Sequence, residues 1–116
     1  MELVRAVPIL SVSDVAASVV AYRAALGLDV LMDHGWIATL GNKGGAPQFS
    51  LMDRDRTAPV NPVASLEVDD VDRAHEQATA LGLEIVYPLT DEPWGVRRFF
   101  FRDADGNVVN VLAHHG

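Results

Sequence analysis

The chain contains no cysteine, which excludes a disulfide framework, a thiolate metal site and a cysteine nucleophile. It also lacks an apolar run of the roughly 20 residues that span a bilayer, and its start lacks the basic and apolar pattern of a secretory signal. Basic side chains are few, nine against sixteen acidic ones, so the net charge is −7 with histidines neutral. This charge disfavours nucleic-acid or anionic-membrane partners and attracts a cationic ligand. We therefore expect a cytoplasmic protein with no membrane partner.

What is present is typical of one globular domain. The chain has 116 residues, of which 49% are hydrophobic and 22% charged. A chain of this length and composition can bury a hydrophobic core without disulfide bonds or a structural metal ion. We expect one domain over residues 1–116. The stretch from Asp53 to Pro62, rich in Asp, Arg and Pro, is interpreted as a surface linker inside it.

The sequence repeats itself. Residues 7–15 (VPILSVSDV) align with residues 63–71 (VASLEVDDV), and the ALGL of residues 25–28 recurs at residues 80–83. A tandem duplication explains both matches better than chance. The two modules cover about residues 3–53 and 62–114.

Each module has the pattern β-α-β-β-β. A β-branched run leads to Asp14 or Asp70, which we expect to cap a helix, and Gly27 or Gly82 ends that helix. Gly-, Pro-, Asn- and Asp-rich turns at 41–45, 91–93 and 103–107 separate the later strands. The expected strands after the helices are 29–33, 36–41, 46–52, 84–89, 96–102 and 108–113. We predict an α+β fold in which the two modules form a curved mixed sheet with a central cleft.

Three motifs carry a family resemblance: VPILSVSD at 7–14, EPWG at 92–95 and FRDADGN at 101–107. Together they resemble the vicinal oxygen chelate superfamily, which includes glyoxalase I, extradiol dioxygenases, fosfomycin-resistance enzymes and bleomycin-resistance proteins. The likeness covers essentially the whole chain. It implies the fold of two βαβββ modules, but it does not select one activity.

The metal-ligand positions of this family hold Val7, Val63 and Asn110 here. Valine offers no donor and one amide oxygen is a weak ligand, so we expect no metal ion and no cofactor. The four histidines, at 34, 75, 114 and 115, form no helical pair, and we expect each at a surface or an edge. Catalysis is accordingly not required.

The metal-free members most similar to this chain are the bleomycin-resistance proteins. Those proteins sequester a flat cationic antibiotic at a dimer interface. The resemblance implies a homodimer, with Pro8 permitting exchange of the N-terminal strand. By this likeness the chain binds an aromatic, cationic small molecule and confers antibiotic resistance.

Two tryptophans are the natural stacking platforms. Trp36 and Trp94 each follow a turn, and the alternative is that they cap the core or form the dimer interface. Phe49 contributes an apolar wall to the ligand site, with core packing as the alternative. Asp33 would face a cation, although a solvated strand edge is the other interpretation.

Strand alternation turns one of Arg97 and Arg98 toward the ligand, and Arg98 is the candidate. An inward arginine would instead favour an anionic or carbonyl-bearing ligand. Ser65 and Asn110 would offer neutral hydrogen bonds. The predicted function is metal-independent binding of a small molecule, such as sequestration of a bleomycin-type antibiotic. The alternatives are a divergent glyoxalase-like lyase or dioxygenase-like metalloenzyme, and a binding protein for an unknown metabolite.

Overall fold

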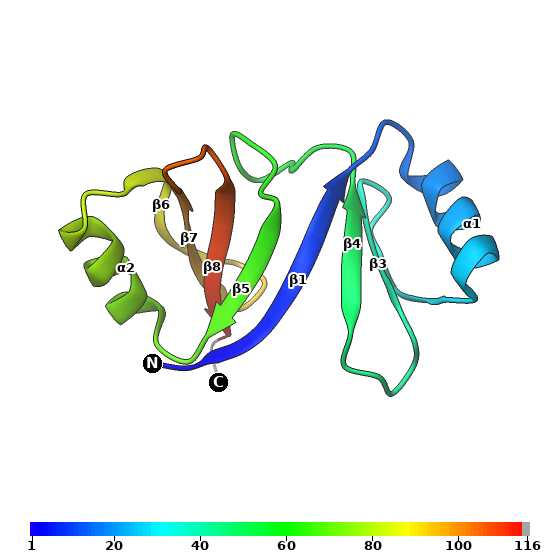
Figure 1. Cartoon of the computed structure of the whole chain (residues 1–116), viewed down its shortest axis with the longest axis horizontal. Helices are drawn as coiled ribbons and strands as arrows, with labels where there is room; N and C mark the ends of the chain where they lie inside the picture. Colours follow the sequence, from blue (N-terminus) through cyan, green and yellow to red (C-terminus); the bar gives the residue numbers. More distant parts are fainter. Residues whose placement is uncertain (115–116) are drawn as a thin grey trace. The chain divides into compact units, whose positions relative to one another are not determined.

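The computed structural model describes residues 1–114 (Figure 1). His115, expected at a surface, lies outside this range. The chain divides into two compact units, which we call unit one, Val7–Asn61, and unit two, Met1–Ala6 with the chain from Pro62 onward. The single domain over 1–116 stays a prediction. Among the described residues, no helix is both long and apolar enough to cross a membrane.

Unit one has four strands and one helix. Strand order is β2-β3-β4-β1, with β1 parallel to β4 and the other neighbours antiparallel. Its elements are the end of β1 (Leu3–Ser11), α1 (Val15–Leu26), β2 (Asp29–Asp33), β3 (Ile37–Gly41) and β4 (Gln48–Met52).

Unit two repeats this topology. Its order is β6-β7-β8-β5, with β5 parallel to β8, and the start of β1 lies next to β5. Its elements are β5 (Ala64–Val68), α2 (Val71–Ala80), β6 (Glu84–Glu92), β7 (Val96–Arg102) and β8 (Val108–His114). The predicted α+β class, the mixed strand pairing and the two βαβββ modules are therefore confirmed.

The helix ends follow the sequence signals. The Asp14 carboxylate accepts from the Ala17 N–H at 3.0 Å, and the Asp70 carboxylate accepts from the Arg73 N–H at 3.1 Å. Each satisfies a backbone donor that the first helical turn leaves unpaired. Gly27 ends α1 with φ 66°, a left-handed conformation in which a Cβ is strained.

One predicted turn is placed differently. Residues 91–93 were expected to form a turn, but β6 continues to Glu92, and the reversal occupies residues 93–95. The reason is ladder pairing, because Asp91 pairs with Arg97 and Glu92 pairs with Val96. The correction places Glu92 on a strand, where its side chain has a defined direction.

The interpretation of residues 53–62 as a surface linker is also wrong in part. Asp55 is only 3% exposed, and Pro62 is fully buried. The Asp55 carboxylate accepts from the Thr57 N–H and hydroxyl, while the Asn61 side chain accepts from the Asp55 N–H. These local bonds let the segment fold back as an ordered loop.

The 103–107 turn is confirmed and is held by one carboxylate. Asp103 accepts from the backbone N–H groups of Asp105 and Asn107, and from the Asn107 amide. These hydrogen bonds, that of the Asn107 side chain first, hold the pKa of Asp103 below its ordinary value. The turn fixes the β7–β8 hairpin on which two candidate site residues lie.

The core of unit two lies between α2 and its sheet. Phe99 and Val111 pack against Val71 and Ala78 of the helix. The His75 ring meets Phe99 edge-on with centroids 5.0 Å apart, and His75 is half-buried. Phe99 and Val111 therefore mark the face of the sheet that α2 covers, and their neighbours along each strand lie on the opposite face.

Candidate functional site

The opposite face of the unit-two sheet carries three of the seven predicted site residues, and a fourth, Trp94, lies in the reversal between β6 and β7. Because neighbouring side chains on a strand alternate, Arg98 and Asn110 point away from the α2 side, to which Phe99 and Val111 point. Ladder pairing sets Ser65 opposite Asn110 and Asn110 opposite Phe100. Residues directly opposite one another share a face. Tyr87 of β6 pairs with Phe100 and is the last member of this row. The row therefore crosses four strands: Ser65 of β5, Asn110 of β8, Phe100 of β7 and Tyr87 of β6.

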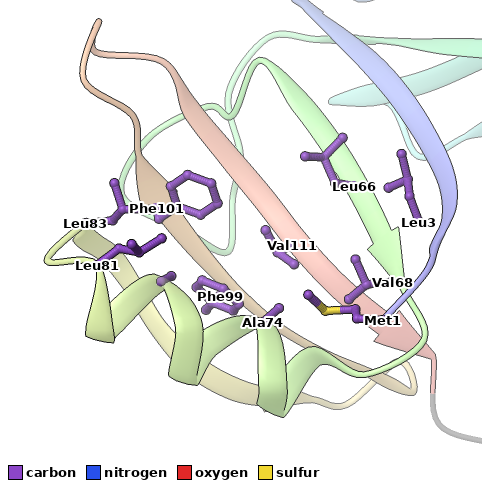
Figure 2. Close-up of a pocket in the computed structure, with 11 residues that line it drawn as sticks. Met1, Leu3, Leu66, Val68, Ala74, Leu81, Leu83, Phe99, Phe101 and Val111 are labelled. Atoms are coloured by element: carbon purple, nitrogen blue, oxygen red, sulfur yellow. The ribbon is translucent and has the colours of Figure 1, made fainter.

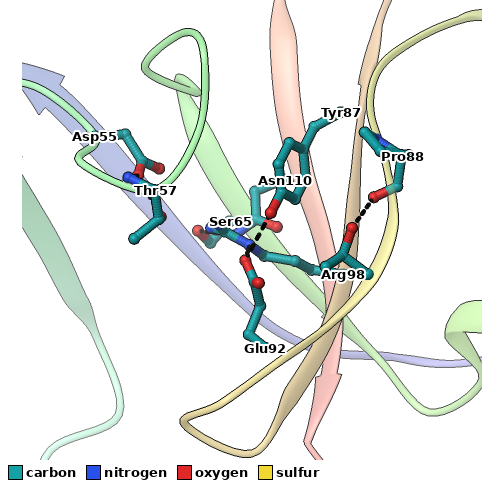
Figure 3. Close-up of polar contacts among 9 residues, drawn as sticks. Asp55, Thr57, Ser65, Tyr87, Pro88, Glu92, Arg98 and Asn110 are labelled. Carbon is teal, nitrogen blue, oxygen red and sulfur yellow. Dashed lines mark hydrogen bonds and ion pairs between the residues drawn. The ribbon is translucent and has the colours of Figure 1, made fainter.

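Arg98 is the centre of this face (Figure 3). Its residue is 5% exposed, and its Nε lies 2.7 Å from a Glu92 carboxylate oxygen. The guanidinium carbon lies 5.1 Å from the Tyr87 ring centroid, 5.2 Å from that of Trp94 and 5.0 Å from that of Phe100. We call these residues, Tyr87, Glu92, Trp94, Arg98 and Phe100, the aromatic–arginine cluster.

Two features let the cluster hold a buried charge. The Glu92 side chain is itself only 7% exposed, and it also accepts from the Tyr87 hydroxyl at 3.0 Å. Ring faces carry negative partial charge, so they attract the guanidinium from several sides. An arginine that is paired and stacked in this way has a fixed orientation, so it can hold the rings that surround it in place.

Of the two arginines, Arg98 is therefore the one on this face, a choice that the sequence left open. Arg97 lies on the other side of β7, where it donates to Asp72 of α2 at 2.9 Å and approaches Asp91 at 3.2 Å. Hydrogen bonds to Asp72 and Asp91 raise the pKa of Arg97. The expected repulsion of a basic ligand by the inward arginine is reduced, because Glu92 compensates its charge.

The Trp94 ring is partly exposed to solvent and is also packed against the buried Arg98 guanidinium. It lies in the reversal between β6 and β7 and is 52% exposed, although the Arg98 guanidinium lies over its ring. A large, half-exposed aromatic ring held by a buried group is suited to stacking on a planar molecule.

Ser65 and Asn110 form a polar pair on the same face. The Asn110 amide nitrogen donates to the Ser65 hydroxyl at 3.0 Å, and Asn110 is only 7% exposed. Its amide oxygen is buried and has no hydrogen-bond partner among residues 1–114. Buried polar atoms without a partner are rare, so this oxygen calls for an explanation.

The other three predicted residues lie in unit one, and two of them are at the β2–β3 turn. Asp33 is exposed, and its carboxylate accepts from the Gly35 N–H at 2.8 Å, so it holds the turn. Trp36 is half-buried, and its carbonyl accepts from the Asp53 N–H at 3.0 Å.

Phe49, the third predicted residue of unit one, packs against helix α1 and not beside polar side chains. Its ring contacts Tyr22 of α1 with centroids 5.3 Å apart, so it belongs to the packing of the helix. Its neighbour Ser50 points to the opposite face of β4, where its hydroxyl hydrogen-bonds Thr39 at 2.8 Å. Thr39 and Ser50 correspond by topology to Phe100 and Asn110 of unit two.

Tyr87 and Glu92 were missed as partners of Arg98. Only Glu92 had a weak signal in the sequence, because Glu92 precedes and Arg98 follows a Pro-Trp-Gly reversal. Placing 91–93 in the turn removed Glu92 from the strand and hid the pairing. The bulge between Tyr87 and Thr90 shifts the register and cannot be read from periodicity.

The residues present do not fit a metal ion. Val7 and Val63 offer no donor atoms, and Asn110 offers one amide oxygen. Among residues 1–114, no group of three or more His, Cys, Asp or Glu side chains could hold an ion. Divalent ions need several converging donors, so we assign no chemistry to a metal at these positions.

A second feature of unit two is an apolar groove on the α2 side of its sheet (Figure 2). Its volume is about 230 Å³. Small side chains on the helix, Ala74 and Ala78, leave room above Leu66 and Val111 of the strands. The lining side chains are all apolar, so the groove offers no group that orients a ligand.

Comparison with known proteins gives a family match. Residues 3–111 match the model of the Glyoxalase/Bleomycin resistance protein/Dioxygenase superfamily. No curated protein matches the chain.

Solved structures share the fold at low identity. A glyoxalase/bleomycin resistance protein/dioxygenase superfamily member from Vibrio splendidus is 18% identical with a TM-score of 0.74, covering 95% of this chain and 97% of its own. A protein described as NAD-dependent benzaldehyde dehydrogenase from Legionella pneumophila is 20% identical with a TM-score of 0.76, covering 94% and 98%. A methylmalonyl-CoA epimerase variant from Streptomyces coelicolor, in complex with 2-nitronate-propionyl-CoA, is 20% identical with a TM-score of 0.71, covering 99% and 100%. These likenesses show the fold alone.

Proposed function

Because this chain belongs to the Glyoxalase/Bleomycin resistance protein/Dioxygenase superfamily, we propose that it is a metal-independent binding protein for a planar small molecule. The observation that carries the proposal is the half-exposed Trp94 ring backed by the buried Arg98–Glu92 pair. Such a ring presents a flat apolar surface whose orientation is already set. Binding to a preorganised surface costs less conformational entropy than binding to a mobile one.

The magnitude of stacking limits what Trp94 does alone. Stacking on an aromatic side chain contributes about 1–3 kcal/mol per planar group, whereas micromolar affinity requires about 8 kcal/mol. Further contacts are therefore needed, and Ser65 and Asn110 supply polar ones on the same sheet face. Trp36 and Asp33, which lie in unit one, stay proposals for ligand contacts that rest on the sequence.

We propose a bleomycin-type antibiotic as the ligand, which the protein would sequester and so confer resistance. The family name includes bleomycin-resistance proteins, and a net charge of −7 favours a cationic drug over an anionic one. A divergent lyase or dioxygenase is the competing enzyme proposal, but the side chains at the metal-ligand positions do not support it. A metabolite-binding role is the third proposal.

Tryptophan fluorescence tests stacking directly, because the chain has only two indoles. The Trp36→Phe variant retains Trp94 as its sole indole, and Trp94→Phe retains Trp36. Titration of Trp36→Phe with metal-free bleomycin should quench its emission saturably at micromolar concentration, with one site per chain. Phenylalanine keeps an aromatic ring, although a smaller one, at each substituted position. Each variant reports only the emission of its remaining tryptophan, so each serves as the control for the other.

The outcomes separate the three proposals. No change in either variant would exclude bleomycin sequestration and favour a metabolite ligand. Quenching only in Trp94→Phe would move the platform to Trp36. Stoichiometric metal in protein purified without chelators would contradict metal independence and favour the enzyme.

We also propose that the protein is a homodimer. Pro8 is exposed within β1, where proline interrupts the row of backbone donors. By the resemblance to bleomycin-resistance proteins, this proline would permit exchange of the N-terminal strand. Light scattering should give twice the chain mass of 12.5 kDa. A mass of one chain at working concentration would refute the dimer.

A further inference from the structure

Helix α1 exposes apolar side chains where a surface helix normally carries polar ones. Eight of its twelve residues are exposed, and Arg23 is the one polar residue among them. The other seven are five alanines, Val20, which is 70% exposed, and Leu26, which is 62% exposed. Figure 1 shows no other element of unit one on that side of α1. A helix that is apolar all round is ordinarily covered on every side, so the exposed side of α1 lacks a partner that its composition predicts.

The second module provides an internal comparison. The two helices begin after equivalent capping residues, Asp14 and Asp70, and each buries the valine that follows the cap. Counted from the caps, three exposed apolar residues of α1 have polar counterparts in α2: Ala17, Val20 and Ala21 correspond to Arg73, Glu76 and Gln77. A helix in this place of the module therefore accepts a polar outer side. Packing on the sheet does not explain why that of α1 is apolar.

The distribution of charge indicates which partner fits this surface. Unit one carries five acidic and four basic side chains, whereas unit two carries eleven and five. Two copies of a chain with a net charge of −7 repel one another, most strongly where unit two faces the other copy. The exposed side of α1 carries no acidic side chain, and the Nε of Arg23 donates to the Leu28 carbonyl of the same chain at 3.2 Å. A second copy therefore meets little repulsion at this surface.

The size of the surface sets the strength of the contact. A helix of twelve residues is about 18 Å long. Stable dimers bury about 800 Å² of each partner, which is more than the exposed side of one such helix offers. Smaller contacts are typical of reversible complexes, so we expect a dissociation constant of about micromolar size.

We propose that two copies of this chain associate by packing the exposed sides of their α1 helices against one another. The proposal rests on the proposed homodimer and names the surface that forms it, and it does not require exchange of the N-terminal strand. Because each copy uses the same surface, the contact closes after two chains. The alanines leave little bulk between the helices, and Val20 supplies the largest side chain at the centre of the contact.

Transfer of the α2 side chains to α1 tests the surface. The triple variant Ala17→Arg/Val20→Glu/Ala21→Gln introduces the residue types of α2 and leaves the net charge at −7, because it adds one charge of each sign. Light scattering of the parent should give twice the chain mass of 12.5 kDa at about 100 µM and one chain mass at about 0.1 µM. The triple variant should raise the dissociation constant at least about tenfold, since the contact would bury charges without partners.

Two further measurements separate association from folding. The far-ultraviolet circular dichroism of the triple variant should match that of the parent, because the same residue types are helical in α2. The melting temperature of the parent should rise with protein concentration, because association stabilises the folded chain, and that of the triple variant should not. If the triple variant loses its helical signal, Val20→Glu alone provides the same test.

Leu81→Gln is the matched control. Leu81 is 77% exposed but lies at the end of α2, beside the apolar groove of unit two, so this substitution should leave association unchanged. Loss of the dimer in Leu81→Gln and not in the triple variant would move the contact to that groove and overturn the proposal.

The remaining outcomes distinguish this inference from the homodimer on which it rests. A folded triple variant that dimerises as tightly as the parent would refute the α1 surface and leave the homodimer intact. A parent that stays monomeric at about 100 µM would refute both. A monomeric parent that binds neutral phosphatidylcholine vesicles, while the triple variant does not, would assign the surface to a lipid and overturn the proposal.

Discussion

Replacing Glu92 by leucine should lower the free energy of unfolding by about 3–5 kcal/mol, the typical cost of removing one partner of a buried ion pair. The Glu92 carboxylate accepts from Arg98 Nε at 2.7 Å and from the Tyr87 hydroxyl at 3.0 Å. Arg98 is 5% exposed and Tyr87 is half-buried, so water cannot fully replace the carboxylate. Chemical denaturation followed by circular dichroism measures the loss.

The double variant Glu92→Leu/Arg98→Met should recover most of that loss, because it removes the charge together with its partner and keeps the volume apolar. Arg97→Met is the matched control on the same strand. The Asp72 and Asp91 side chains that pair with Arg97 are 61% and 65% exposed, so its effect should stay within about 1 kcal/mol. A double variant as unstable as Glu92→Leu would show that the pair is needed for more than mutual neutralisation.

Truncation of Phe99 to alanine should have an effect of similar size, about 3–5 kcal/mol. The ring is fully buried between β7 and α2, where it contacts His75 and packs with Val71, Ala78 and Val111. Its removal takes away apolar contact area and leaves a cavity that α2 cannot fill without moving. Thermal and denaturant unfolding would both report the change.

Phe101→Ala provides the comparison, because Phe101 lies two residues along the same face and is half-buried. Partial exposure reduces both the lost burial and the cavity, so the destabilisation should be clearly smaller. Equal losses for the two variants would contradict the placement of Phe99, rather than Phe101, at the centre of the core between β7 and α2. Neither substitution touches the face that carries Arg98.

Local patterns in the sequence were sufficient for the elements and their duplication. Asp14 and Asp70 cap the helices because a carboxylate at that position reaches the backbone N–H three residues on, which needs no tertiary contact. The repeat placed two βαβββ modules, and the resemblance supplied a family that the match over residues 3–111 shows. The alternation of β7 required that one of Arg97 and Arg98 lie on each face.

Which arginine lies on which face was decided by tertiary structure. Helix α2 covers the side of Phe99 and Arg97, and this leaves Arg98 on the side of Tyr87 and Phe100. The position of Glu92 also depended on ladder pairing, since its Asp-Glu-Pro context is typical of a turn. Asp55 is buried for the same kind of reason, through bonds to Thr57 and Asn61.

Sequence by itself therefore determined the modules, the helix caps, the turn at 103–107 and the absence of a complete donor set at the family's metal-ligand positions. Only the tertiary structure showed the stacked, paired Arg98 and the unpaired oxygen of Asn110. The reason is physical. Caps and turns are satisfied within a few residues, whereas the partners of a buried side chain come from strands whose register and covering helix are set by the whole module.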